Sequence, residues 1–114
     1  MTDCLFCKMA AGEIRPDTVL ENDDVIAFRD INPQAPTHVL VIPRQHIATL
    51  NDLQPAQAEL VGKMYLAAQE VARIDGLDQR GYRTVMNCLE EAGQSVFHLH
   101  LHVLGGRPMQ WPPG

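Results

Sequence analysis

The spacing of apolar residues between positions 55 and 74 is the clearest pattern in the chain. These residues recur at intervals of three and four, which is typical of one face of an amphipathic helix: Leu60, Met64, Ala67, Val71 and Ile74. Gly76 is expected to end this long helix. Residues 4–12 predict a second, short helix that ends at Gly12.

The other apolar runs are short and predict strands. Residues 18–30 hold two β-rich runs around Asn22-Asp23-Asp24, which indicates a hairpin. Four consecutive apolar residues predict a buried strand over 37–44, closed by Pro43. Residues 81–88 and 95–105 predict two more strands, joined by an acidic, glycine-bearing loop. The chain is therefore expected to form an α+β fold, with a mainly antiparallel five-stranded sheet, one long helix and one short helix.

Three of the five histidines stand at every second position of the last predicted strand. Since side chains alternate between the faces of a strand, His98, His100 and His102 should project from one face, roughly 7 Å apart. The other face would bury Phe97, Leu99, Leu101 and Val103. Exposed surface histidines or a chance metal site are the ordinary explanations. Three in register beside glycine-rich segments favour a phosphoryl-transfer site instead, because one imidazole can be a neutral nucleophile while another is an acid.

Composition and charge narrow the class of protein. The 114 residues are 46% hydrophobic, which suits one domain over 1–114. The net charge of −5 argues against nucleic acid or an anionic membrane as a partner. We find no apolar run of the roughly 20 residues that a membrane span needs and no signal-peptide pattern at the start, so a cytoplasmic location is expected.

The three cysteines are an odd number, which makes a disulfide framework improbable. Cys4 and Cys7 form a C-x-x-C pair, and His46 follows the third predicted strand. Two thiolates and two imidazoles suit tetrahedral zinc, with His98 as the best candidate for the fourth ligand. The spacing matches no zinc-finger pattern, so ordinary small residues on a short helix are the competing explanation. A metal-bound His98 would leave His100 to attack and His102 to act as the acid.

The segment HLHLHVL matches the H-φ-H-φ-H-φ-φ signature (φ is an apolar residue) of the histidine triad (HIT) superfamily. Together with FRDINPQAPTHVLVIPRQHI and GQSVFHLHLHVLGGRPMQWPPG, it resembles the branch of histidine triad nucleotide-binding proteins, from about Cys4 to the last residue. The resemblance implies a homodimer that hydrolyses purine nucleoside 5′-phosphoramidates. It also implies a structural zinc, while no redox cofactor or magnesium is expected.

The resemblance also implies a role for each matching residue. His100 would form the nucleotidyl-histidine intermediate, with His102 and His38 completing the polar cluster. Asp30 would hold the ribose hydroxyls. The base slot would be lined by Leu5, Phe6, Met9, Ile31 and Leu40. The phosphate and the leaving group would lie near Asn87, Gly93, Gln94 and Ser95.

Each of these residues also has an ordinary structural explanation. Asp30 can form a turn, Asn87 can cap a strand, and His38 can be a hydrogen-bonded strand histidine. The apolar residues of the slot would each be assigned to the core on periodicity alone. Only as a set do they predict a nucleotide site.

Three further functions compete with phosphoramidate hydrolysis at this point. Nucleotidyl transfer to a sugar phosphate is less favoured, because the transferase branch has Gln where this chain has His102. Hydrolysis of dinucleoside polyphosphates and a nucleotide-binding regulatory module that acts through protein partners both stay open.

The aperiodic tail with Trp111 is expected to reach the active site of a second subunit.

Overall fold

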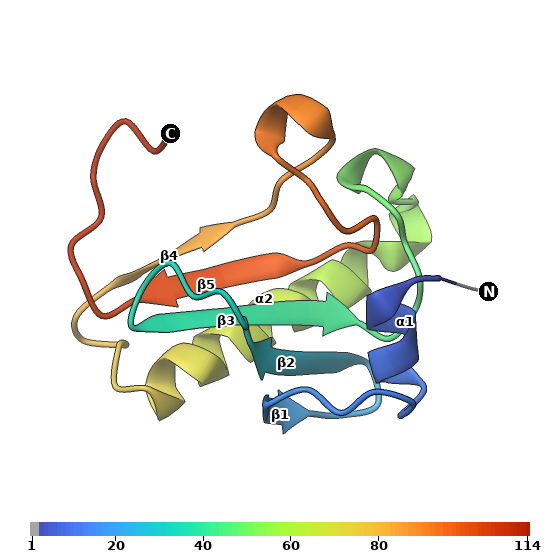
Figure 1. Cartoon of the computed structure of the whole chain (residues 1–114), viewed down its shortest axis with the longest axis horizontal. Helices are drawn as coiled ribbons and strands as arrows, with labels where there is room; N and C mark the ends of the chain where they lie inside the picture. Colours follow the sequence, from blue (N-terminus) through green and yellow to red (C-terminus); the bar gives the residue numbers. More distant parts are fainter. Residues whose placement is uncertain (1–2) are drawn as a thin grey trace.

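The computed structural model describes residues 3–114, and its centre is one antiparallel sheet with the strand order β1-β2-β3-β5-β4. The strands span Thr18–Glu21 (β1), Val25–Arg29 (β2), Thr37–Pro43 (β3), Tyr82–Val85 (β4) and Leu101–Gly105 (β5). The helices are α1 (Leu5–Ala10) and α2 (Ala58–Ile74), and the short 3₁₀ turns are η1 (Leu50–Asp52), η2 (Pro55–Gln57) and η3 (Glu90–Ala92). The predicted α+β fold is confirmed (Figure 1).

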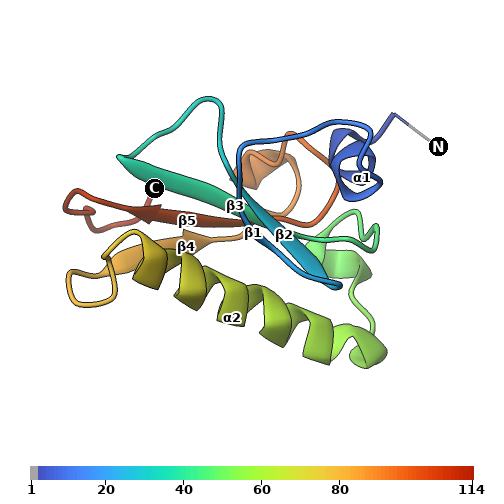
Figure 2. The same cartoon turned by 90° about the horizontal axis from the view of Figure 1, so that it is seen from below.

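The sheet separates two apolar clusters because its side chains alternate between its faces. Figure 2 shows α2 along one face and α1 against the other. The α2 face buries the larger cluster: Val25, Ala27, Val39, Val41, Ile47, Met64, Ala67, Ala68, Val71, Leu99, Leu101 and Val103. The α1 face buries a smaller one: Phe6, Ile26, Phe28, Leu40 and Ile42. Each large side chain buried here contributes about 1.5–3 kcal/mol.

The long helix agrees with its predicted periodicity. Its buried residues include Met64, Ala67 and Val71, and it ends just before Gly76, whose φ of +72° suits a glycine after a helix. Ile74, at the last position, is half exposed. Within the described residues we find no helix that has the length and the apolar character to cross a membrane.

The last strand is shorter than predicted, because β5 begins at Leu101 rather than at residue 95. The chain bends over residues 96–98, and Leu99 N donates to Ile47 O at 2.6 Å instead of joining a strand ladder. Leu99, Leu101 and Val103 still point into the α2 core. The prediction that Phe97 packs with them is wrong: this side chain lies within the bend and is 50% exposed.

Candidate functional site

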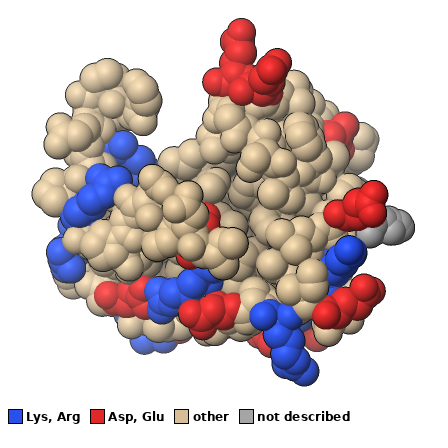
Figure 3. All heavy atoms as spheres, viewed as in Figure 1, with Lys and Arg blue, Asp and Glu red and all other residues tan. Residues whose placement is uncertain are grey.

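A cleft of about 460 Å³ lies on the α1 face of the sheet. Phe28 and Leu40, which are cross-strand neighbours on β2 and β3, form its floor. Helix α1 forms one wall, and His100 and His102 stand at the β5 end, because Leu40 is also in register with His102. In Figure 3, which views this face, charged side chains lie mostly around the edge. The lining is therefore mostly apolar, and two imidazoles stand at its β5 end.

Most of the predicted nucleotide-binding residues and two of the predicted catalytic histidines line this cleft: Leu5, Phe6, Met9, Asp30, Ile31, Leu40, Ser95, His100 and His102. Ile31 is fully exposed and Leu5 is 43% exposed, so both lie at the mouth. Four other predicted residues are not among the lining residues: His38, Asn87, Gly93 and Gln94. The structure thus brings the predicted base-slot residues and two of the histidines to one cleft, whereas Asn87, Gly93 and Gln94 are outside its lining.

Several lining residues were not predicted from the sequence: Ile14, Arg15, Pro16, Asp17, Phe28, Arg29 and Val96. Phe28 could have been found, since it shares a strand face with Ile26 and alternates with the α2-facing Ala27. The segment 14–17 belongs to no helix or strand, so periodicity gave no signal for it.

His100 has a fixed proton arrangement. Its Nδ1 lies 2.7 Å from the carbonyl oxygen of His98, to which it must donate because a carbonyl only accepts. In the neutral ring this bond leaves Nε2 with its lone pair. Phe6 packs edge-on against the imidazole, with ring centroids 5.3 Å apart. His100 is therefore a buried, oriented imidazole with a nucleophilic nitrogen.

His38 and His102 form a hydrogen-bonded pair beside Asp30. Gln34 N donates to His38 Nδ1 at 3.0 Å, so the proton of neutral His38 is on Nε2. That N–H lies 2.9 Å from His102 Nδ1 and 3.4 Å from Asp30 Oδ2. His102 Nδ1 then accepts, and its own proton is on Nε2. The Gln34 main chain thus sets the proton positions of both rings.

Burial keeps this pair uncharged. Desolvation is the main cause that lowers the pKa of His102 to about 4, and the charges of His100 and His38 lower it further. Desolvation also lowers the pKa of His38, against the opposing charge of Asp30. At neutral pH His102 is accordingly a neutral ring that offers an N–H.

A second cluster brings together the four predicted metal ligands, Cys4, Cys7, His46 and His98, whose ligand atoms lie within 4.8 Å of one another. Cys4 is the N-cap of α1 and Cys7 lies in its first turn. Cys7 Sγ is 3.1 Å from His46 Nδ1, and Cys4 Sγ is 3.3 Å from His98 Nδ1. These residues can hold a metal ion.

The protons of His98 suit that role. His98 Nε2 lies 2.8 Å from Pro43 O and donates to it, which leaves the Nδ1 lone pair directed at the thiols. Ligating histidines commonly donate their other N–H to a carbonyl in this way. Burial, followed by the hydrogen bond and the charge of Cys4, raises the pKa of Cys7 to about 11, so metal binding would have to displace a thiol proton.

Asp30, His38 and His102 also place one ligand atom each within 4.8 Å of one another. Ligation by His38 Nε2 would require its proton to move to Nδ1, where the Gln34 N–H already points. Asp30, His38 and His102 are therefore suited to ordered hydrogen bonds rather than to a metal.

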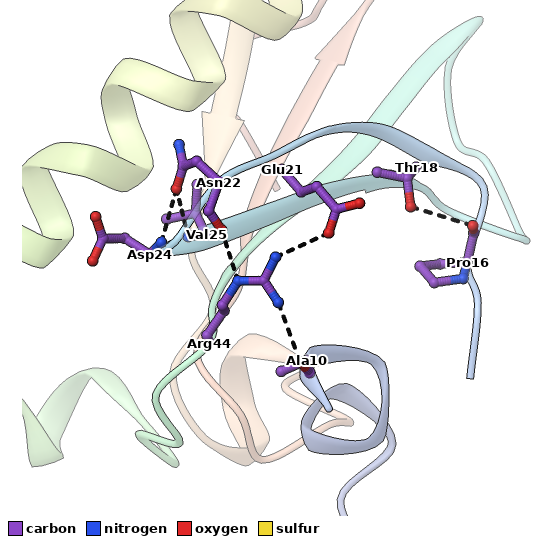
Figure 4. A network of polar contacts seen from close by, with 8 residues as sticks. All are labelled: Ala10, Pro16, Thr18, Glu21, Asn22, Asp24, Val25 and Arg44. Carbon is purple, nitrogen blue, oxygen red and sulfur yellow. Dashed lines mark hydrogen bonds and ion pairs between the residues drawn. The ribbon is translucent and has the colours of Figure 1, made fainter. Parts of the chain in front are cut away.

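Arg44, just after β3, fixes α1 over the sheet (Figure 4). Its guanidinium donates to the carbonyl oxygen of Ala10 at 3.1 Å, to that of Asn22 at 2.7 Å and to Glu21 Oε1 at 2.9 Å. Because α1 carries residues of both the cleft and the metal cluster, Arg44 positions one wall of each.

The fold, the cleft and the histidine row together define a HIT protein, and the HIT domain family model matches residues 11–109. The chain belongs to the HIT family. It is 44% identical over 107 residues to the purine nucleoside phosphoramidase of Escherichia coli, and the match covers 94% of this chain and 90% of that protein.

Solved structures agree with this assignment. A HIT family hydrolase from Legionella pneumophila is 52% identical, with a TM-score of 0.96, and the match covers 98% of this chain and all of that one. A histidine triad protein from Clostridium difficile is 41% identical, with a TM-score of 0.93 and 96% coverage of both chains. These relatives support hydrolase activity.

Proposed function

We propose that this protein hydrolyses purine nucleoside 5′-phosphoramidates through a nucleotidyl-His100 intermediate. The observation that carries the proposal is the lone pair of His100 Nε2, which is fixed by the bond from Nδ1 to His98 O at the polar end of an apolar cleft. The name of the 44% identical relative from E. coli gives the substrate class.

We assign each part of the nucleotide to a part of the cleft. The base would lie between α1 and the floor of Phe28 and Leu40, and Asp30 Oδ2 would accept from the ribose hydroxyls. Asp30 Oδ1 already accepts from Asn32 N at 2.8 Å, which orients the carboxylate. Ser95 would donate to the phosphate, with Asn87 and Gly93 assigned to the same phosphate and leaving-group region.

The reaction has two steps. His100 Nε2 attacks the α-phosphorus, the P–N bond to the amine breaks, and the amine leaves with a proton that reaches it through the N–H of His102 or from a neighbouring donor. Water then attacks the phosphorus, and the bond to His100 breaks. Over the cycle one water supplies the oxygen of the released nucleotide and the proton of the amine.

Zinc is the metal that best fits the Cys4, Cys7, His46 and His98 cluster. Tetrahedral zinc, with bonds of about 2.0–2.3 Å, places its ligand atoms roughly 3.3–3.8 Å apart. The sulfur–nitrogen distances of 3.1–3.5 Å in the cluster are close to this range. We assign the zinc a structural role, in which it ties α1 to the end of β3 and to the segment before β5.

The proposal includes a homodimer and a cytoplasmic location. On the exposed side of α2 and on β4 lie Tyr65, Leu66 and Tyr82, large side chains that a second copy would cover. The three cysteines, Cys4, Cys7 and Cys88, are free, as is usual in a reducing compartment.

The test is a panel of nucleotides incubated with the purified protein and followed by mass spectrometry. We expect release of the free nucleotide from adenosine and guanosine phosphoramidates, and a nucleotidyl adduct on His100 after rapid acid quenching. Transfer to an added sugar phosphate would indicate a transferase, and faster cleavage of a dinucleoside polyphosphate would indicate a hydrolase of that class. Nucleotide binding without turnover of any of these would indicate a regulatory module.

A further inference from the structure

Gln94 was expected at the phosphate, but its side chain is turned into the loop that precedes β5. It is only 7% exposed. Its Oε1 accepts from Leu89 N at 2.8 Å, and its Nε2 donates to Ala48 O at 2.9 Å and to Val96 O at 3.2 Å. The carboxamide therefore joins three main-chain segments and has at least one good partner for each of its polar atoms.

Leu89, at one end of this network, has an unusual backbone. Its φ is +69° and its ψ is −171°, and among the described residues no other residue besides glycine has a positive φ. This region of backbone conformation is populated almost only by glycine, so it persists at a leucine only where the surroundings impose it. The side chain is 44% exposed, whereas the main-chain N and O of Leu89 both have hydrogen-bond partners.

Two hydrogen bonds between Gln94 and Leu89 hold Leu89 in this conformation. The Gln94 side chain accepts from Leu89 N, and Gln94 N donates to Leu89 O at 3.1 Å, which closes the turn η3 between them. The residues that follow directly, Ser95 and Val96, line the cleft. Gln94 thus bonds to the strained Leu89 and directly precedes the two residues that line the proposed phosphate end of the cleft.

We propose that Gln94 is a positioning residue: it holds Leu89 in a strained conformation and thereby places Ser95 and Val96 at the phosphate end of the cleft. The inference rests on the proposed function for the identity of the ligand. It assigns Gln94 no contact with the substrate. The bonds to Ala48 and Val96 fix the far side of the loop, so the loss of the carboxamide should free residues 89–96 as a unit.

The experiment compares Gln94→Met, Leu89→Gly and the double variant. In Gln94→Met we expect kcat/KM for a phosphoramidate to fall roughly 10- to 100-fold, since small displacements of binding groups cost this much. Affinity for AMP should fall, while affinity for adenosine, which has no phosphate, should be unchanged. Gln57→Met is the matched control, because Gln57 Oε1 also accepts from a backbone N–H, at 2.9 Å, but lies outside the cleft.

The double variant separates positioning from direct contact. Glycine adopts the conformation of Leu89 without strain, so Leu89→Gly should restore part of the activity of Gln94→Met, giving non-additive effects. Strictly additive effects, or equal losses of adenosine and AMP affinity, would overturn the proposal. Because the affinities are measured without turnover, a failure of the proposed hydrolysis would be seen separately, as AMP binding without cleavage of any phosphoramidate.

Discussion

His98 and His38 are both buried on the α1 side of the sheet, but their hydrogen bonds to the main chain run in opposite directions. His98 donates from Nε2 to the carbonyl oxygen of Pro43, which leaves a lone pair facing two thiols. His38 accepts at Nδ1 from Gln34 N, which leaves an N–H facing His102. One cluster is thereby prepared for a cation and the other for a chain of hydrogen bonds.

The difference shows that the residue types in a cluster indicate its candidate chemistry but do not decide which ring nitrogens are free to take part in it. Each cluster holds two imidazoles with anionic or acidic partners in reach. What separates them is whether the main chain presents a carbonyl or an amide to the ring, because the main-chain partner fixes which nitrogen keeps its proton.

The largest expected effect contrasts His100 with His46. His100→Ala should reduce phosphoramidate hydrolysis by several orders of magnitude, because the covalent route is lost, while nucleotide binding survives. His46→Ala, in the cluster of proposed zinc ligands, should retain most of the rate of phosphoramidate hydrolysis. Steady-state kinetics and calorimetric binding provide the measurements, and a His100→Ala enzyme with more than about a tenth of wild-type turnover would contradict the assignment.

Metal removal should affect stability more than rate. Protein purified without added metal is expected to contain one zinc per chain, and chelation should lower the Tm by about 10 °C or more with a smaller change in kcat. Cys4→Ser should mimic the loss. Cys88→Ser is the matched control, since this free cysteine is outside the cluster. Elemental analysis that finds no metal in fresh and in zinc-soaked samples would rule out the site.

The cluster of Asp30, His38 and His102 should make the free energy of unfolding depend on pH. The pKa of His102 is lowered to about 4 in the folded protein, against an ordinary value of 6.5, so the unfolded chain binds more protons between these two values. The free energy of unfolding should therefore decrease as pH falls from about 7 to about 5. In His102→Gln this decrease should be shallower. Urea titrations of both proteins test it, and equal slopes would show that His102 does not contribute.

Removal of the C-terminal tail, residues 108–114, should have the smallest effect on activity. Arg107 donates from Nη2 to Gln34 O at 3.0 Å, so the tail is attached to the residue whose N–H orients His38, and Trp111 is 80% exposed. We expect that removal of residues 108–114 shifts the preference among phosphoramidates with different amines, and that Trp111 fluorescence responds to substrate. Unchanged kcat/KM for every amine, together with sedimentation as a monomer, would eliminate both the tail role and the dimer.

The strong periodic signals predicted most of the fold. The long helix and the hairpin of β1 and β2 follow directly from apolar spacing and from the turn residues between the two strands. The last strand was predicted too long, because alternation continues through Leu99 even though that residue bonds to Ile47 outside the sheet. Side-chain alternation indicates which face of the sheet each side chain is on. It carries no information about where the hydrogen bonds to the neighbouring strand end.

Some features of the candidate site could also be predicted from the sequence, and others could not. The residue types pointed to the Cys4, Cys7, His46 and His98 cluster and to the histidine row, because thiols and imidazoles are the usual ligands of a metal such as zinc and imidazole is a common nucleophile and acid. The orientation of Gln94 could not be predicted, since it depends on backbone carbonyls at Ala48 and Val96 that only the folded chain brings near. The proton positions depend on the main chain for the same reason.

The Arg44 contacts have a consequence for how the specificity of this protein can diversify. Arg44 holds α1 through the carbonyl oxygen of Ala10, a group that every residue type possesses. This contact is therefore independent of the helix side chains, in contrast to the packing of Phe6 in the sheet cluster. An exposed position such as Leu5 can be exchanged in a directed-evolution library while both contacts are kept, so α1 is a natural place to recruit new ligands.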